Sequence, residues 1–103
     1  MKDTYFTIAG MNHYYGTDIL KKSMKVKLVK EPDNEYDREA IRVELKGLGK
    51  IGYVANSTYT VLGDCCSAGR LYDRMKKKAK GRVVAITPRG VVCKLQVEAA
   101  EDK

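Results

Sequence analysis

Six short segments of the chain have the apolar and polar pattern of β-strands. Each is rich in β-branched or aromatic residues or alternates apolar with charged positions, as strands with one buried face do. The segments are residues 5–9, 24–28, 41–45, 50–54, 82–86 and 91–97. Residues 47–49, Gly-Leu-Gly, form a tight connection that predicts a hairpin between the third and fourth strands.

The pattern changes its period between the fourth and fifth strands. Asn56 is a residue type that caps helix N-termini, and apolar residues follow it at helical spacing, namely Tyr59, Leu62 and Cys66. Gly69 is expected to interrupt this helix, and residues 70–78 could form a second one. The sequence therefore predicts one or two short helices inserted before the last strand pair.

These elements predict a mainly β fold in one domain. Six short strands with mostly local antiparallel pairing, in a chain of 103 residues, are typical of a small closed barrel of the OB or SH3-like kind. The domain spans 1–103, with a core over about 5–97 and a polar tail at 98–103.

Composition narrows the class of protein. Hydrophobic residues make up 44% of the chain and charged residues 32%, which excludes both a disordered chain and a membrane protein. No signal-peptide stretch follows Met1, so the expected location is cytoplasmic. The three cysteines lack metal-ligand spacing and are expected to pack as small apolar residues, so no metal or cofactor is expected.

Positive charge is concentrated in one stretch of the chain. The formal net charge is +7, and residues 70–89 contain eight basic residues and one acid, which together equal the whole net charge. A localised basic stripe fits a polyanion-binding surface, although a solvated face that aids solubility explains it equally well. The stripe residues considered for binding are Arg70, Arg74, Lys76, Lys77, Lys78, Lys80 and Arg82.

Two predicted loops carry the candidate binding residues. Tyr14, Tyr15 and Tyr36 lie outside the apolar-periodic positions, and tyrosine offers a flat face on which a base can stack. The alternative is that one or two of these rings pack beneath the loops, and the neighbours Tyr14 and Tyr15 are expected to point apart. His13 has no nucleophile or paired ligand at a recognisable spacing, so a contact to phosphate or base, or a structural role, is favoured over catalysis.

Asp37 is an acid beside an aromatic residue in a basic protein. Carboxylates repel phosphates, but a carboxylate can accept a hydrogen bond from a sugar hydroxyl, which is most useful at a free 3′-OH. The alternative is local, because Asx side chains often cap turns; this reading is favoured for Asp33 and Asn34.

Three segments resemble the HIRAN domain, a DNA-binding module that occurs alone in bacteria or fused to helicase-like and nuclease proteins. Residues 9–16 resemble the family's Gly-x-x-x-aromatic-x-Gly stretch. Residues 29–43 closely match its hallmark of an acid-Pro pair, two Asx residues, Tyr-Asp and Ala-Ile. Residues 50–54 match its Ile-Gly-Tyr-Val-like strand.

The resemblance implies a six-stranded barrel that binds the 3′ end of single-stranded DNA. It implies that Asp37 receives the terminal 3′-OH and that Tyr36 stacks on the last nucleotides. It also implies contacts from His13, Tyr14 and Tyr53, and the candidate binding residues further include Asn12 and Lys50. The family's DNA-bound example has a basic residue at the position of Asn12, an aromatic one at His13 and a Lys near Asn56, so this chain differs from it at all three.

The sequence therefore predicts a non-catalytic module that recognises 3′-OH ends of single-stranded DNA, accessory to DNA repair, replication or processing. Helicase or nuclease proteins are the implied partners, and no membrane is involved. The alternative is a protein-interaction module that docks an acidic partner on the basic stripe.

Overall fold

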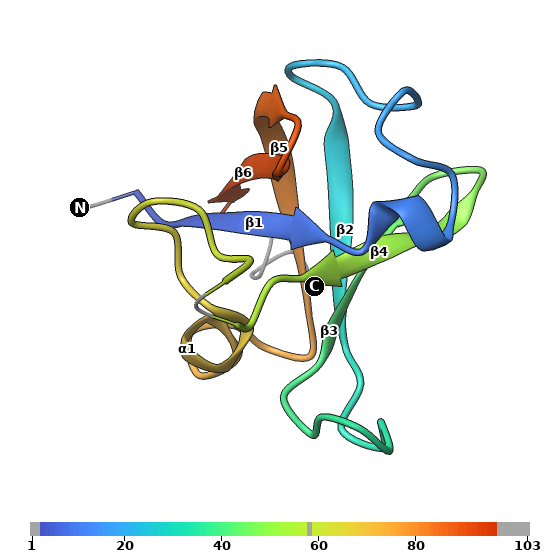
Figure 1. Ribbon diagram of the computed structural model, residues 1–103. Helices are drawn as coiled ribbons and strands as arrows, with labels where there is room; N and C mark the ends of the chain where they lie inside the picture. Colours follow the sequence, from blue (N-terminus) through green and yellow to red (C-terminus); the bar gives the residue numbers. More distant parts are fainter. Residues whose placement is uncertain (1–2, 58, 97–103) are drawn as a thin grey trace.

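Six antiparallel strands close into a barrel in the order β1-β4-β3-β2-β5-β6 in the computed structural model, which describes residues 3–57 and 59–96 (Figure 1). The elements are β1 (Tyr5–Ala9), the 3₁₀ turn η1 (Met11–His13), β2 (Lys25–Lys30), β3 (Ile41–Leu45), β4 (Gly49–Val54), α1 (Ala68–Tyr72), β5 (Lys78–Thr87) and β6 (Gly90–Gln96). The mainly β barrel predicted from the sequence is confirmed, and so is the hairpin of β3 and β4. The predicted polar tail lies outside the described residues.

The interior of the barrel is filled by the apolar positions of the alternating segments. Side chains that are fully buried come from five of the six strands, among them Ile8, Leu28, Ile41, Ile51 and Cys93. Burying a side chain of this size stabilises the folded state by about 1.5–3 kcal/mol. The three cysteines are free thiols, and the burial of Cys66 and Cys93 agrees with their expected packing role.

The helix predicted to begin at Asn56 does not form. Residues 59–60 and 63–64 form turns, and the single α-helix of the described chain, α1, begins after Ser67. The Ser67 hydroxyl accepts a hydrogen bond from the amide of Arg70 at 3.4 Å. Gly69 lies inside this helix and does not interrupt it. The reason is tertiary, because the amide of Cys66 donates to a β1 carbonyl at 2.7 Å and holds the segment extended against that strand.

The hairpin of β2 and β3 has two ends with different surroundings. Lys30 pairs with Ile41 at one end, where the loop of residues 31–40 joins the two strands. The turn from β3 to β4 lies at the opposite end, as Figure 1 shows. Gly47 and Gly49 in that turn have φ values of 93° and 79°, which glycine adopts at least cost. Within the described residues, no helix has the length and apolar character needed to cross a membrane.

Candidate functional site

A surface pocket of about 420 Å³ brings together four residues predicted to bind nucleic acid. We call it the tyrosine pocket, and its lining includes Tyr14, Asn34, Tyr36, Asp37 and Tyr53. Three separate segments form it, because Tyr14 follows η1, Asn34 to Asp37 lie in the loop after β2, and Tyr53 lies on β4. Tyr36 is 93% exposed, so its ring is available to a ligand.

Asn34 gives the loop after β2 its conformation. Its Oδ1 accepts hydrogen bonds from the amides of Tyr36 at 2.8 Å and Asp37 at 3.0 Å. Its Nδ2 donates to Glu31 Oε1 at 2.9 Å. This is an Asx-type turn, as expected for Asn34. Asp33 is exposed, and its side chain forms no hydrogen bond with the described residues, so the local role expected for it is absent there.

Both oxygens of the Asp37 carboxylate are engaged within the protein. Oδ1 accepts from the amide of Glu39 at 2.9 Å, and Oδ2 accepts from Asn56 Nδ2 at 3.0 Å. Asn56 Oδ1 in turn accepts from the amide of Gly69 at 2.9 Å. A carboxylate has about four acceptor positions, so two remain for an external hydroxyl. The structure thus shows the local role of Asp37, and its role toward a ligand stays a prediction.

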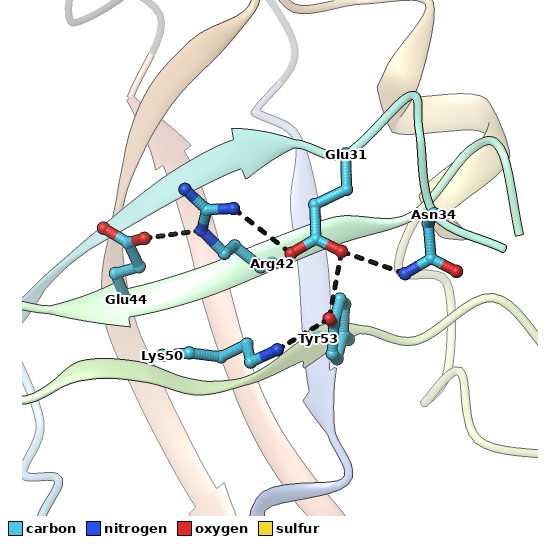
Figure 2. Close-up of polar contacts among 6 residues, drawn as sticks. All are labelled: Glu31, Asn34, Arg42, Glu44, Lys50 and Tyr53. Carbon is cyan, nitrogen blue, oxygen red and sulfur yellow. Dashed lines mark hydrogen bonds and ion pairs between the residues drawn. The ribbon is translucent and has the colours of Figure 1, made fainter. Parts of the chain in front are cut away.

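Tyr53 lies at the centre of a network of charged side chains (Figure 2). Its hydroxyl donates to Glu31 Oε1 at 3.0 Å and accepts from Lys50 Nζ at 3.0 Å. Arg42 completes the network, because its Nη1 lies 3.2 Å from Glu31 Oε2 and its Nε donates to Glu44. Two acids and two bases therefore balance one another beside the tyrosine pocket.

The network shifts the pKa values of its members in consistent directions. Burial alone would raise the pKa of Glu31, but hydrogen bonds from Asn34, Tyr53 and Arg42 outweigh it, and the pKa lies below its ordinary value. The hydrogen bond to Tyr53 raises the pKa of Lys50. Both groups are therefore held in their charged forms at neutral pH.

Lys50 also contacts the aromatic rings of the pocket. Its Nζ lies 5.5 Å from the centroid of the Tyr14 ring and 5.0 Å from that of Tyr53, within the range of a cation–π contact. Lys50 thus places a positive charge beside two of the rings that line the pocket. Tyr15 points elsewhere, with its hydroxyl 3.5 Å from the carbonyl of Leu48, so the two neighbouring tyrosines do diverge.

Asn12 and His13 do not line the tyrosine pocket. They line a separate, more polar hollow of about 250 Å³, together with Thr60, Thr87 and Arg89. The structure therefore places Asn12 and His13 apart from the tyrosines with which the sequence grouped them.

The basic stripe extends away from the pocket. Arg70 on α1 comes nearest, because it lines a hollow of about 440 Å³ with Asn56, the partner of Asp37. Arg74 lies near Thr4, and Lys76 and Lys77 precede β5. The remaining cations occupy alternate positions of β5 beside β2, namely Lys78, Lys80 and Arg82.

Sequence reasoning missed the residues that hold the site together. Glu31, Arg42 and Asn56 position Tyr53 and Asp37, although none was proposed for a role in binding. Glu31 and Arg42 both lie in the 29–43 segment, but their contact joins residues eleven positions apart and depends on strand pairing. Within residues 3–57 and 59–96, no group of three acidic, His or Cys side chains is placed to hold a metal ion.

Comparisons with known proteins give a family and a fold. The family model of the HIRAN domain matches residues 1–99. A crystal structure of a protein from Lactobacillus plantarum is similar, with a TM-score of 0.63 and 22% sequence identity over 89% of this chain and 88% of that one. No curated protein matches the chain.

Proposed function

The chain belongs to the HIRAN domain family, a family of DNA-binding domains, and we propose that it binds the 3′-OH end of single-stranded DNA without catalysing a reaction. The observation that carries the proposal is the convergence of Tyr14, Tyr36, Asp37 and Tyr53 on one pocket. A role beside helicase or nuclease proteins in DNA repair, replication or processing is part of the same proposal.

The two exposed rings supply the surface for the bases. Tyr36 is 93% and Tyr14 39% exposed, and stacking a base on such a ring contributes roughly 1–3 kcal/mol. Charge-assisted contacts add about 1.5–3 kcal/mol each. After the cost of association, the net affinity is about micromolar.

Asp37 supplies the selectivity for the end of the strand. Its carboxylate has acceptor positions left for a hydroxyl, while a terminal phosphate at the same place would meet a like charge. We expect a 3′-phosphate to weaken binding at least about tenfold, which corresponds to about 1.4 kcal/mol. Lys50, whose charge interacts with Glu31 beside the pocket, can contact a phosphate further along the strand.

Fluorescence anisotropy with short oligonucleotides tests the proposal. A strand with a free 3′-OH should bind more tightly than the same strand with a 3′-phosphate, and Asp37→Asn should reduce this difference. Asp33→Asn, in the same loop but outside the pocket, is the matched control. Equal affinity for the two ends in the unmodified protein would refute end recognition.

A second comparison tests stacking. Tyr36→Ala should weaken binding by about 5-fold to 150-fold, the equivalent of 1–3 kcal/mol. Tyr59→Ala is the control, because Tyr59 is 88% exposed and does not line the tyrosine pocket. If the two substitutions have the same effect, the tyrosine pocket is not the site of base stacking.

A further inference from the structure

A second hollow lies at the opposite end of the β2–β3 hairpin from the tyrosine pocket. It has a volume of about 510 Å³ and lies between the start of β2, the β3–β4 turn and β5. Among the described residues, four lysines line it, Lys25, Lys27, Lys46 and Lys80, together with one acid, Glu44. We call it the lysine groove.

Strand pairing sets like charges beside one another at this groove. Lys25 pairs with Arg82 and Lys27 with Lys80 across β2 and β5, so in each pair both side chains lie on the outer face of the barrel. Like charges directly opposite in a sheet destabilise it. Lys25 and Lys27 therefore place positive charge at the groove that an anionic ligand would offset.

The acid in the groove leaves most of this charge uncompensated. Glu44 pairs with Lys27 in register, but its carboxylate is bound by Arg42 Nε at 2.5 Å. The side chains of Lys25, Lys27 and Lys46 form no ion pair or hydrogen bond with any residue in the described part of the chain. Their ammonium groups therefore keep all three donors for a ligand.

We propose that the lysine groove binds phosphates of the same DNA strand, upstream of the 3′ end held in the tyrosine pocket. The proposal rests on the function proposed above. The distance along β2 from Lys30 to Lys25 is about 17 Å at ~3.3 Å per residue. A stacked strand advances ~3.4 Å per nucleotide, so the groove is reached about five nucleotides from the pocket.

The spacing of the lysines fits the phosphates of a nucleic-acid strand that continues from the tyrosine pocket. Lys25 and Lys27 project from the same face of β2 about 6.6 Å apart along the strand. Measured along the axis of a stacked strand, alternate phosphates advance by nearly the same distance, ~6.8 Å. Lys78 and Lys80 on the adjacent strand extend this positive surface toward the end of β2 that leads to the tyrosine pocket.

A length series measures the contribution of the groove. Oligothymidylates of about 4 and 12 nucleotides with free 3′-OH ends are compared, because only the longer one can reach from pocket to groove. With two added phosphate contacts, raising salt from about 50 to 200 mM should weaken binding of the 12-mer about sevenfold more than that of the 4-mer. The variant Lys25→Gln/Lys27→Gln should lose this extra salt dependence and the extra affinity of the 12-mer, while its affinity for the 4-mer stays unchanged.

The matched control is Lys21→Gln/Lys22→Gln, which removes the same charge from exposed residues that do not line the groove. The proposal for the lysine groove would be overturned if both double variants lost the extra affinity of the 12-mer equally. It would also be overturned if Lys25→Gln/Lys27→Gln kept that extra affinity. A third result would also overturn it: Lys25→Gln/Lys27→Gln keeps the extra affinity of the 12-mer but loses affinity for an oligoglutamate of equal length. The groove would then bind acidic proteins. The groove variant is expected to fold with an equal or higher melting temperature, since the like-charge pairs are relieved.

The same series separates this proposal from the proposed function. If 4-mers with a 3′-OH and a 3′-phosphate bind equally, end recognition fails. A length effect lost in Lys25→Gln/Lys27→Gln but not in the control would then show that the groove binds strands without regard to their ends. That result would overturn the link between groove and pocket.

Discussion

Removing one oxygen atom from the site tests how the network around Tyr53 contributes to stability. In Tyr53→Phe the ring stays in the tyrosine pocket, but the hydrogen bonds to Glu31 and from Lys50 are lost. Hydrogen bonds to charged groups contribute about 1.5–3 kcal/mol each. Water can partly replace them, because the side chain of Glu31 is 17% exposed, so we expect a net loss of about 1.5 kcal/mol. For a domain of this size that lowers the melting temperature by about 6–12 °C.

The effect should depend on pH with a defined sign. The folded state lowers the pKa of Glu31 below 4.5, so its stabilisation is complete above that pH and is lost as the pH falls through the lowered value. The difference in melting temperature between Tyr53→Phe and the unmodified protein should therefore be constant above pH 4.5 and shrink as the pH falls through the lowered pKa of Glu31. Tyr72→Phe is the control, because the Tyr72 ring is also contacted by a lysine, Lys30, but its hydroxyl has no hydrogen-bond partner within the described residues. Equal melting temperatures at pH 7, or a difference independent of pH, would refute this account of the network.

Three further predictions concern the fold and the loop. Gly52→Ala should destabilise the protein by about 1–3 kcal/mol in urea unfolding, because its Cβ would lie 2.9 Å from a β1 carbonyl oxygen; an unchanged midpoint would contradict this. Burial raises the pKa of the Cys93 thiol to about 12, so a thiol reagent at pH 8 should modify Cys65 rapidly and Cys93 only on unfolding; equal rates would contradict this. Asn34→Ala should speed amide hydrogen exchange at Asp37, whose amide it binds, and unchanged exchange would show that the loop is held otherwise.

Much of the barrel could be predicted from the sequence, because alternation of apolar and polar residues is a local signal. Ile41 to Leu45 alternates, and the structure buries its apolar positions. The helix predicted to begin at Asn56 was wrong because helical spacing is also a local signal. The contact that holds this segment extended joins Cys66 to Tyr5 on β1, about sixty residues earlier in the chain. Periodicity cannot report such a contact.

The tyrosine pocket was predictable only in part, for a related reason. Tyr36 and Asp37 are adjacent in sequence, so their proximity was certain, and the family motif pointed to Tyr14 and Tyr53. Asn12 and His13 immediately precede Tyr14 in sequence, yet they lie within η1 and line another hollow, whereas Tyr14 at its C-cap lines the pocket. Backbone geometry at a turn decides which of two neighbouring side chains faces a site, and the residue types alone do not encode it.

The distribution of charge differs between the two surfaces and suits them to the different roles that we propose. Beside the tyrosine pocket, Glu31 and Glu44 are balanced by Arg42 and Lys50, and Asp37 adds a negative charge. Such a pocket can select the end of a strand through stacking and hydrogen bonds, but it attracts phosphates weakly. The cations that could hold the strand lie along β2 and β5 instead. Selectivity for the end should therefore vary little with salt, whereas affinity for long strands should fall steeply as salt rises.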